Sequence, residues 1–315
     1  MKKFLFTTWV FSCLSILCIV ILYIGINWAT NKTASFEAVG SPNYVVLGHS
    51  HPACAFNDSL IDNFKNFSES GESYFYTYIK IKKLLEQRPS IQTVFIEFDN
   101  YQIRNHMNDW IWTDEHLAYR LSRYSPFMEI NESKLIMAKN LKGFITYSSL
   151  STKKNLFNLF YNYHNYSYKI GGYEQLDRRL NDSLINTQLI DSTLKYDTDS
   201  LSYYSIEYLD KIVQFCKSMK KQVFLIRCPM HPESNGIKNE VTFQHILTER
   251  FSNTEFLDFH KFPLPNNEFG DLEHLNYFGA CRFSKWFNKL LKSDIISQQN
   301  KQMRINIQIQ NIDAK

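Results

Sequence analysis

Three residues of the types used in nucleophilic catalysis stand far apart in the chain: Ser50, Asp271 and His274. A serine hydroxyl is a weak nucleophile until a base accepts its proton, and histidine suits that task near neutral pH. The histidine needs a third group, usually a carboxylate, to orient it. Asp271 and His274 are three residues apart, so a single turn can present both side chains to one site. The alternative is a turn serine, a helix-capping aspartate and a surface histidine.

Two further histidines, His49 and His51, flank Ser50. If the chain were extended there, both side chains would point to the same side and could bind one metal ion. Two ligands do not complete a metal site, and no His-x-x-x-His or paired-cysteine motif supplies the others. The sequence also has no glycine-rich phosphate loop. We therefore predict neither a metal nor another cofactor.

Alternating elements must position these residues. Short buried runs predict strands, and amphipathic runs predict the helices between them. The strands are expected at 43–47, 64–68, 93–98, 223–228 and 255–259. Helices are expected through Leu60 and Ile61 and at 73–87, 204–219, 241–251 and 277–291. This order predicts a doubly wound α/β fold, with a parallel sheet of about five strands and helices on both faces.

The site of such a fold lies beyond the carboxyl ends of its strands. Ser50 follows the first predicted strand, Gly71 the second, Asn100 the third and His231 the fourth. Asp271 and His274 follow the fifth. We expect the sheet to gather these residues along one edge.

Two blocks of sequence resemble a known family. The run VVLGHSHPACAFNDS, at 45–59, resembles the first block of SGNH (GDSL-like) hydrolases, a strand ending in Gly-Asp-Ser. The run FGDLEHLNYFGA, at 269–280, resembles the last block, Asp-x-x-His-Leu-Asn before a helix. The resemblance covers about 43–292 without the central insertion. It implies a flavodoxin-like sheet and a serine enzyme in which Ser50 attacks an ester carbonyl, His274 shuttles the proton and Asp271 orients the imidazole.

The same family takes its oxyanion donors from the nucleophile's backbone N–H, a glycine after the second strand and an asparagine after the third. By resemblance these are Ser50, Gly71 and Asn100, although a turn glycine and a turn asparagine are the alternatives. The sequence departs from the family pattern twice: His49 replaces the block-one aspartate, and Glu97 replaces the glycine of Gly-x-Asn-Asp.

Two histidines remain as candidates for substrate binding. His51 is close to the predicted nucleophile, and His231 ends the fourth predicted strand at the same edge. Structural or surface roles are the alternative for both.

The N-terminus predicts a membrane anchor. Lys2 and Lys3 precede an uncharged run from Phe4 to Trp28. As a helix, about 25 residues would extend about 37 Å, enough to cross a bilayer core of about 30 Å. The run is long for a cleaved signal peptide. Residues 1–28 are therefore expected to be a single anchor with its N-terminus in the cytoplasm and the remainder facing the periplasm or exterior.

The rest of the chain divides into a linker at 29–41, an SGNH-like domain at 42–292 with a mostly helical insertion at about 101–201, and a polar tail at 293–315. Of six cysteines, Cys54, Cys216, Cys228 and Cys281 lie outside the anchor and either pair or remain as buried thiols. A net charge of +4 without a basic block argues against nucleic-acid partners.

Three functions remain open. The first is O-acyl transfer to, or removal from, a cell-envelope polysaccharide, with an acyl-ester donor and a glycan as partners. The second is an esterase or lipase acting on small soluble esters. The third is a non-catalytic SGNH-like scaffold that partners a membrane acyltransferase.

Overall fold

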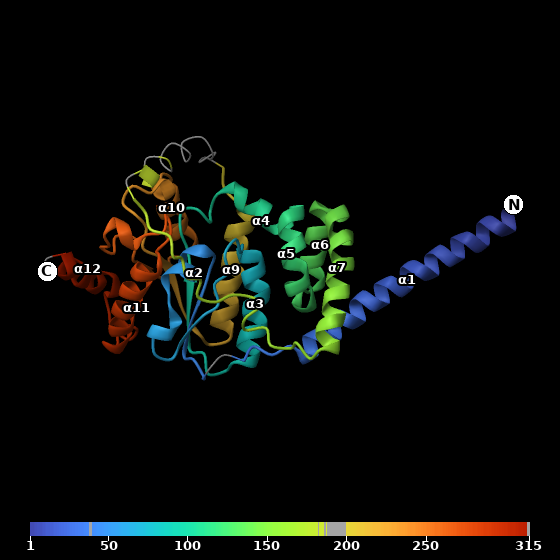
Figure 1. Ribbon diagram of the computed structural model, residues 1–315, viewed down its shortest axis with the longest axis horizontal. Helices are drawn as coiled ribbons and strands as arrows, with labels where there is room; N and C mark the ends of the chain where they lie inside the picture. Colours follow the sequence, from blue (N-terminus) through green and yellow to red (C-terminus); the bar gives the residue numbers. More distant parts are fainter. Residues whose placement is uncertain (38–39, 182, 186, 188–199, 314–315) are drawn as a thin grey trace. The chain divides into compact units, whose positions relative to one another are not determined.

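The computed structural model describes residues 1–37, 40–181, 183–185, 187 and 200–313. The chain divides into two compact units. One comprises Met1–Glu37 and Ile111–Lys169, and the other comprises Ala38–Trp110 and Ile170–Lys315. Figure 1 shows the elements of both units, which are described separately below.

The second unit contains a parallel five-stranded sheet in the order β2-β1-β3-β4-β5. Its strands are β1 (Tyr44–Leu47), β2 (Phe64–Asn66), β3 (Thr93–Glu97), β4 (Gln222–Arg227) and β5 (Glu255–Asp258). The predicted doubly wound α/β fold is thus confirmed. The chain passes from β1 outward to β2 and returns to the other side at β3, so the switch in strand order lies between β1 and β3. Ligand sites in open parallel sheets occur at this switch.

Helices cover both faces of the sheet. They are α2 (Ser50–Ala55), α3 (Tyr74–Gln87), α9 (Tyr203–Ser218), α10 (Glu240–Arg250), α11 (Tyr277–Lys292) and α12 (Lys301–Asp313). Helices α3 and α9 pack together on one face, and α2 and α11 pack together on the other (Figure 1).

The helix after β1 is shorter than predicted. It ends at Ala55 and does not continue through Leu60 and Ile61. The Asn57 side chain accepts the backbone N–H of Ser59 at 3.2 Å and begins a separate 3-10 turn. A side chain that satisfies a nearby backbone N–H in this way competes with helix continuation.

Aromatic side chains form the core between the sheet and α11. Phe56, Phe95 and Phe259 all lie with their ring centroids within 5.7 Å of Phe287. The residues expected to be a polar tail contribute to this core, because α12 buries Ile305 and Ile309 in the same cluster. Apolar residues alternate strictly at 305–309, which is the pattern of a strand. Ile305 and Ile309 are also four residues apart, the spacing of one apolar helix face, and the structure has the helix.

The first unit consists of the apolar N-terminal helix and the helices of the insertion: α1 (Lys2–Thr33), α5 (Asp114–Tyr124), α6 (Ile130–Lys139) and α7 (Leu141–Phe160). Helix α4 (Asp109–Trp112) crosses the boundary in sequence between the units. The insertion is mostly helical, as predicted. Part of its expected span, residues 188–199, lies outside the described residues.

Helix α1 is long and apolar enough to span a membrane. It continues to Thr33, so the segment expected to be a linker from residue 29 begins as helix. Its last turns carry a polar contact: Asn27 Oδ1 accepts hydrogen bonds from Ser125 Oγ at 3.1 Å and Asn155 Nδ2 at 3.3 Å. These bonds, buried among helices of the same unit, fix the end of α1 against α7.

All six cysteines are free thiols, and Cys54, Cys216 and Cys228 are buried. Of the two alternatives left open by the sequence, the structure therefore has the unpaired thiols.

Candidate active site

Ser50, His274 and Asp271 meet at the carboxyl edge of the sheet. Ser50 is the first residue of α2, directly after β1, and its Oγ lies 2.7 Å from His274 Nε2. The opposite ring nitrogen, Nδ1, lies 2.8 Å from Asp271 Oδ1 and 3.0 Å from Oδ2. The side chains of His274 and Asp271, which follow β5, are largely buried: 18% of His274 and 13% of Asp271 are exposed. This is the arrangement in which a histidine can accept a proton from a serine hydroxyl.

The loop after β5 holds the carboxylate and the imidazole in one short turn. Asp271 Oδ1 accepts the backbone N–H groups of Glu273 and His274, each at 2.8 Å. The backbone N–H of Gly270 donates to His274 O at 2.9 Å and closes the loop. The three-residue spacing therefore places both side chains on one site through an Asx turn.

Asn276 joins this loop to the helix that follows. Its side-chain oxygen caps α11 by accepting the backbone N–H groups of Phe278 and Gly279. Its amide nitrogen donates to the backbone oxygens of Asn267 and Phe269 at 2.8 and 3.1 Å. Capping of this kind fixes where a helix begins, and here it also fixes the loop that carries His274.

The carboxylate of Asp271 is kept ionised by its neighbours. Burial alone would raise the pKa of Asp271, but the hydrogen bond and charge of His274 outweigh it and hold that pKa well below its usual value. Arg178 forms an additional ion pair with Asp271 Oδ2 from a largely exposed position. An ionised carboxylate can fix a proton on Nδ1 and leave Nε2 able to accept one from serine.

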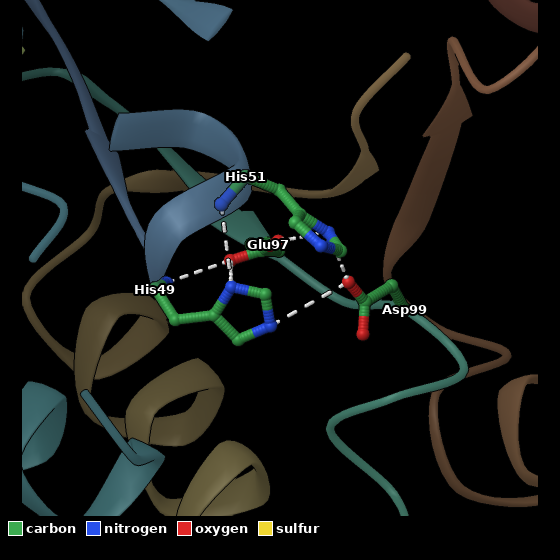
Figure 2. Close-up of side chains that lie close together, drawn as sticks. All are labelled: His49, His51, Glu97 and Asp99. Atoms are coloured by element: carbon green, nitrogen blue, oxygen red, sulfur yellow. Dashed lines mark hydrogen bonds and ion pairs between the residues drawn. The ribbon is translucent and has the colours of Figure 1, made fainter. Parts of the chain in front are cut away.

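A second group of buried polar side chains lies beside the triad. Figure 2 shows His49, which precedes α2, and His51, in the first turn of α2, facing Glu97 and Asp99 at the carboxyl end of β3. His51 Nδ1 lies 2.7 Å from Asp99 Oδ2 and 3.2 Å from Glu97 Oε1. The His51 ring also lies 5.1 Å, between centroids, from the ring of His274. The two groups are therefore neighbours at the switch point of the sheet.

Burial and mutual charge separate the pKa values of these four groups. Burial, together with the charge of Asp99, raises the pKa of Glu97 to about 8. Burial opposes ionisation of Asp99 as well, but the charges of His51 and His49 lower its pKa well below normal. Burial likewise lowers the pKa of His49, whereas His51 has a raised pKa because its carboxylate neighbours outweigh burial.

Glu97 explains why residue 48 is glycine. The backbone N–H of His49 donates to Glu97 Oε2 at 2.7 Å, so the carboxylate is packed directly against the turn. A Cβ on Gly48 would lie 2.7 Å from Pro52 Cγ and closer still to Glu97. The glycine in Gly-His-Ser thus leaves room for the Glu97 carboxylate.

We expect Gly48→Ala to lower the free energy of unfolding by about 1–3 kcal/mol, the usual cost of overpacking a well-filled site. Chemical denaturation measures this loss. Gly25→Ala is the matched control, because no heavy atom would lie within 4 Å of its added Cβ. Equal stability of the two variants would contradict this expectation and would show that the turn at Gly48 can accommodate a methyl group.

The two predicted oxyanion residues differ in their surroundings. Gly71 lies in a turn after β2 with φ +68°, a left-handed conformation that favours glycine. The Asn100 side chain is buried and engaged, since Nδ2 donates to Glu240 Oε2 and Oδ1 accepts from Arg227 Nη1, each at 2.8 Å. In this arrangement its amide binds a side-chain network, and its role as an oxyanion donor stays a prediction.

His231 lines a pocket, and its ring forms hydrogen bonds with residues outside the triad. Its Nε2 lies 3.1 Å from Asn266 Oδ1, and its Nδ1 accepts the backbone N–H of Glu233. It borders a pocket together with His260, Phe262 and Phe269, which all follow β5. Substrate binding by His231 or His51 therefore stays a prediction, with His51 the nearer of the two to the triad.

Three polar residues of the site were not recognised from the sequence as parts of it: Glu97, Asp99 and Arg178. Glu97 and Asp99 were missed because their position opposite His49 and His51 depends on the register between β1 and β3. Arg178 belongs to the insertion, and its position offered no pattern that points to Asp271.

The fold and site define an α/β protein with a parallel sheet and a Ser-His-Asp arrangement at its carboxyl edge. The sequence model of an uncharacterised protein family matches residues 63–296, and the chain belongs to that family. The match includes Asp271 and His274 but begins after Ser50. Among curated proteins, none matches this chain.

Proposed function

We propose that this protein carries out serine-dependent acyl-ester chemistry outside the cytoplasmic membrane, most specifically O-acyl transfer to or from a cell-envelope glycan. The observation that carries the proposal is the continuous hydrogen-bonded series from Ser50 Oγ through His274 to Asp271, with contacts of 2.7 and 2.8 Å. The resemblance of two blocks to SGNH hydrolases supports the same reading. No metal or nucleotide enters the chemistry proposed for the serine.

The proposed reaction has two steps. Ser50 Oγ attacks the carbonyl carbon of an acyl ester while its proton passes to His274 Nε2. The ester's C–O bond then breaks, and His274 returns the proton to the departing alcohol, leaving the acyl group on Ser50. A sugar hydroxyl or water attacks the acyl-serine in the second step, gives its proton to His274 and regenerates the Ser50 hydroxyl.

Developing negative charge on the carbonyl oxygen requires fixed donors. Ser50 begins α2, and the first N–H groups of a helix have no partner within the helix. Its backbone N–H is therefore the best supported donor, and Gly71 is the second candidate because its turn follows the neighbouring strand β2.

The location is inferred from the N-terminal helix. Lys2 and Lys3 precede the apolar run of α1, and positive charge tends to remain on the cytoplasmic side. We propose that the N-terminus is inside and the α/β unit faces the periplasm or exterior, where envelope glycans are the abundant acceptors.

The test is a product analysis with the full chain in detergent. An aryl acetate is supplied as donor, alone and with an excess of a short polysaccharide fragment as acceptor. An acyltransferase forms acetylated sugar at the expense of free acetate, whereas an esterase forms acetate in both reactions. Either result supports acyl-ester chemistry at Ser50 if it is lost in Ser50→Ala. Absence of both products from a folded protein contradicts the proposal and favours a scaffold that binds a membrane acyltransferase.

A further inference from the structure

Four side chains at the switch point have the composition of a metal site. His49 precedes α2 and His51 lies in its first turn, while Glu97 ends β3 and Asp99 follows it (Figure 2). Each offers one ligand atom, and the four atoms lie within 4.8 Å of one another. All four side chains are buried, with His51 the most exposed at 5%. The proposed serine chemistry does not use these groups as acid, base or nucleophile.

We propose that His49, His51, Glu97 and Asp99 bind a divalent first-row transition metal, with Zn²⁺ as the best fit. Two imidazoles and two carboxylates are ligands that Zn²⁺ accepts, and four protein ligands in a closed pocket are typical of structural zinc. The absence of thiolates from the group distinguishes it from the common cysteine-rich structural sites.

The spacing of the ligand atoms fits such an ion. Zinc–ligand bonds of about 2.0–2.1 Å in a tetrahedron place neighbouring ligand atoms roughly 3.3 Å apart. His51 Nδ1 lies 3.2 Å from Glu97 Oε1, and His49 Nε2 lies 3.6 Å from Asp99 Oδ2. The separation of 2.7 Å between His51 Nδ1 and Asp99 Oδ2 is shorter. An ion there would require that pair to open by roughly half an ångström.

One atom of each residue is left without a hydrogen bond. Within the part of the chain that the structure describes, His49 Nε2, His51 Nδ1, Glu97 Oε1 and Asp99 Oδ2 are buried atoms that form none. They approach one another at ion-pair distances of 2.7–3.6 Å. Buried polar atoms are normally satisfied, so four such atoms converging from four residues point to a missing common partner.

The remaining atoms of the carboxylates are already engaged. Asp99 Oδ1 accepts the backbone N–H groups of Tyr101 and Gln102, each at 3.0 Å. Glu97 Oε2 accepts the backbone N–H of His49 at 2.7 Å and Gln102 Nε2 at 3.2 Å. Outer contacts of this kind orient metal ligands. They direct Asp99 Oδ2 and Glu97 Oε1 toward the histidines.

The outer nitrogen of His49 completes this arrangement. His49 Nδ1 lies 3.3 Å from Glu97 Oε2, and a proton shared between these atoms leaves the Nε2 lone pair for a metal. The backbone N–H of His51 donates to the same Nδ1 at 3.3 Å, so metal binding at Nε2 would require Nδ1 to exchange this hydrogen bond for one in which it donates to the carboxylate.

Charge gives a further reason for a divalent ion. Metal ligation requires deprotonated carboxylates and neutral imidazoles, and in that state the four buried groups carry a formal charge of −2, which is costly to bury without a counter-ion. A divalent cation neutralises that charge in place. Bound there, it would fasten the turn that carries Ser50 to the end of β3. The binding itself does not depend on the proposed serine chemistry.

The first test is metal content. The full chain, purified in detergent without added metal or chelator, should contain about one equivalent of a first-row metal by elemental mass spectrometry. After chelation, titration with Zn²⁺ should give one tight site. His51→Gln and Asp99→Asn should each weaken Zn²⁺ binding by about 100-fold or more, since losing a direct ligand exceeds the 10–100-fold typical of outer-shell loss. His245→Gln, at an exposed histidine on α10, is the matched control and should bind as the unaltered chain does.

A second measurement avoids the risk that ligand variants fail to fold. X-ray absorption at the zinc edge of the unaltered protein should show nitrogen and oxygen ligands only, at about 2.0–2.1 Å, including two imidazoles. No stoichiometric Zn²⁺ after titration, or a spectrum with thiolate sulfur or with water oxygens alone, would overturn the proposal. Ester turnover is not part of either readout, so failure here and failure of the proposed enzyme activity remain distinct.

Discussion

Ser50→Ala should reduce turnover of an activated ester by about 10³-fold or more, because it removes the only oxygen placed 2.7 Å from His274 Nε2 among the described residues. What activity persists would come from the oxyanion donors and substrate binding. Initial rates with an aryl acetate measure the effect under conditions where the unaltered chain is saturated.

The same substitution should change the free energy of unfolding by no more than about 0.5 kcal/mol. Ser50 is only partly buried, and alanine is tolerated at the start of a helix. Thermal unfolding of the two proteins side by side supplies this control. A loss of activity accompanied by a large loss of stability would mean that Ser50 is structural, and the serine mechanism would lose its main support.

Asp271→Asn should lower the same rate by about 10⁴-fold, the loss seen when a triad aspartate is replaced by its amide. An asparagine can keep the backbone hydrogen bonds that Asp271 Oδ1 accepts from Glu273 and His274. Its amide nitrogen then replaces Oδ2, 3.0 Å from His274 Nδ1, and the negative charge that fixes a proton on Nδ1 is lost, so the imidazole is no longer held in the tautomer that accepts from Ser50. The loop should therefore remain folded while Nε2 loses its ability to accept from Ser50.

Arg178→Ala is the matched comparison for that prediction. Arg178 contacts Asp271 Oδ2, but its side chain is 59% exposed, so solvent screens the pair. We expect a rate loss of about 10-fold at most. A loss as large as that of Asp271→Asn would show that the arginine, and not the backbone turn, holds the carboxylate in position. Steady-state kinetics of both variants on one substrate decide between these cases.

The sheet was predictable because its central strands, β3 above all, are buried on both faces. Runs such as Val94–Ile96 are continuous in β-branched and aromatic residues, and such runs read as parallel strands. The helix boundaries at α3, α9 and α11 were predicted to within about one or two residues, the usual uncertainty of helix ends. The C-terminal helix was not predicted, since the alternating isoleucines of α12 favour a strand by pattern and only packing on the core selects the helix.

The parts of the site that lie within one short segment were predictable from the spacing of their residues. Asp271 and His274 share a turn, so their spacing was informative by itself. The partners of Asn100 were not predictable, because Arg227 and Glu240 are more than 120 residues away in sequence. The same holds for the carboxylates facing His49 and His51, whose position depends on the register between β1 and β3. Pairing across a sheet is a tertiary property that spacing within one segment does not reveal.

The most direct test of the central claim is covalent labelling of the full chain with a fluorophosphonate, followed by peptide mapping. The probe reacts with a serine only when a nearby base activates it. We predict a single labelled serine at Ser50, with the label lost in His274→Ala at unchanged fold. No labelling of a folded protein, or labelling of Ser50 that persists in His274→Ala, would contradict the account of an activated serine at this site.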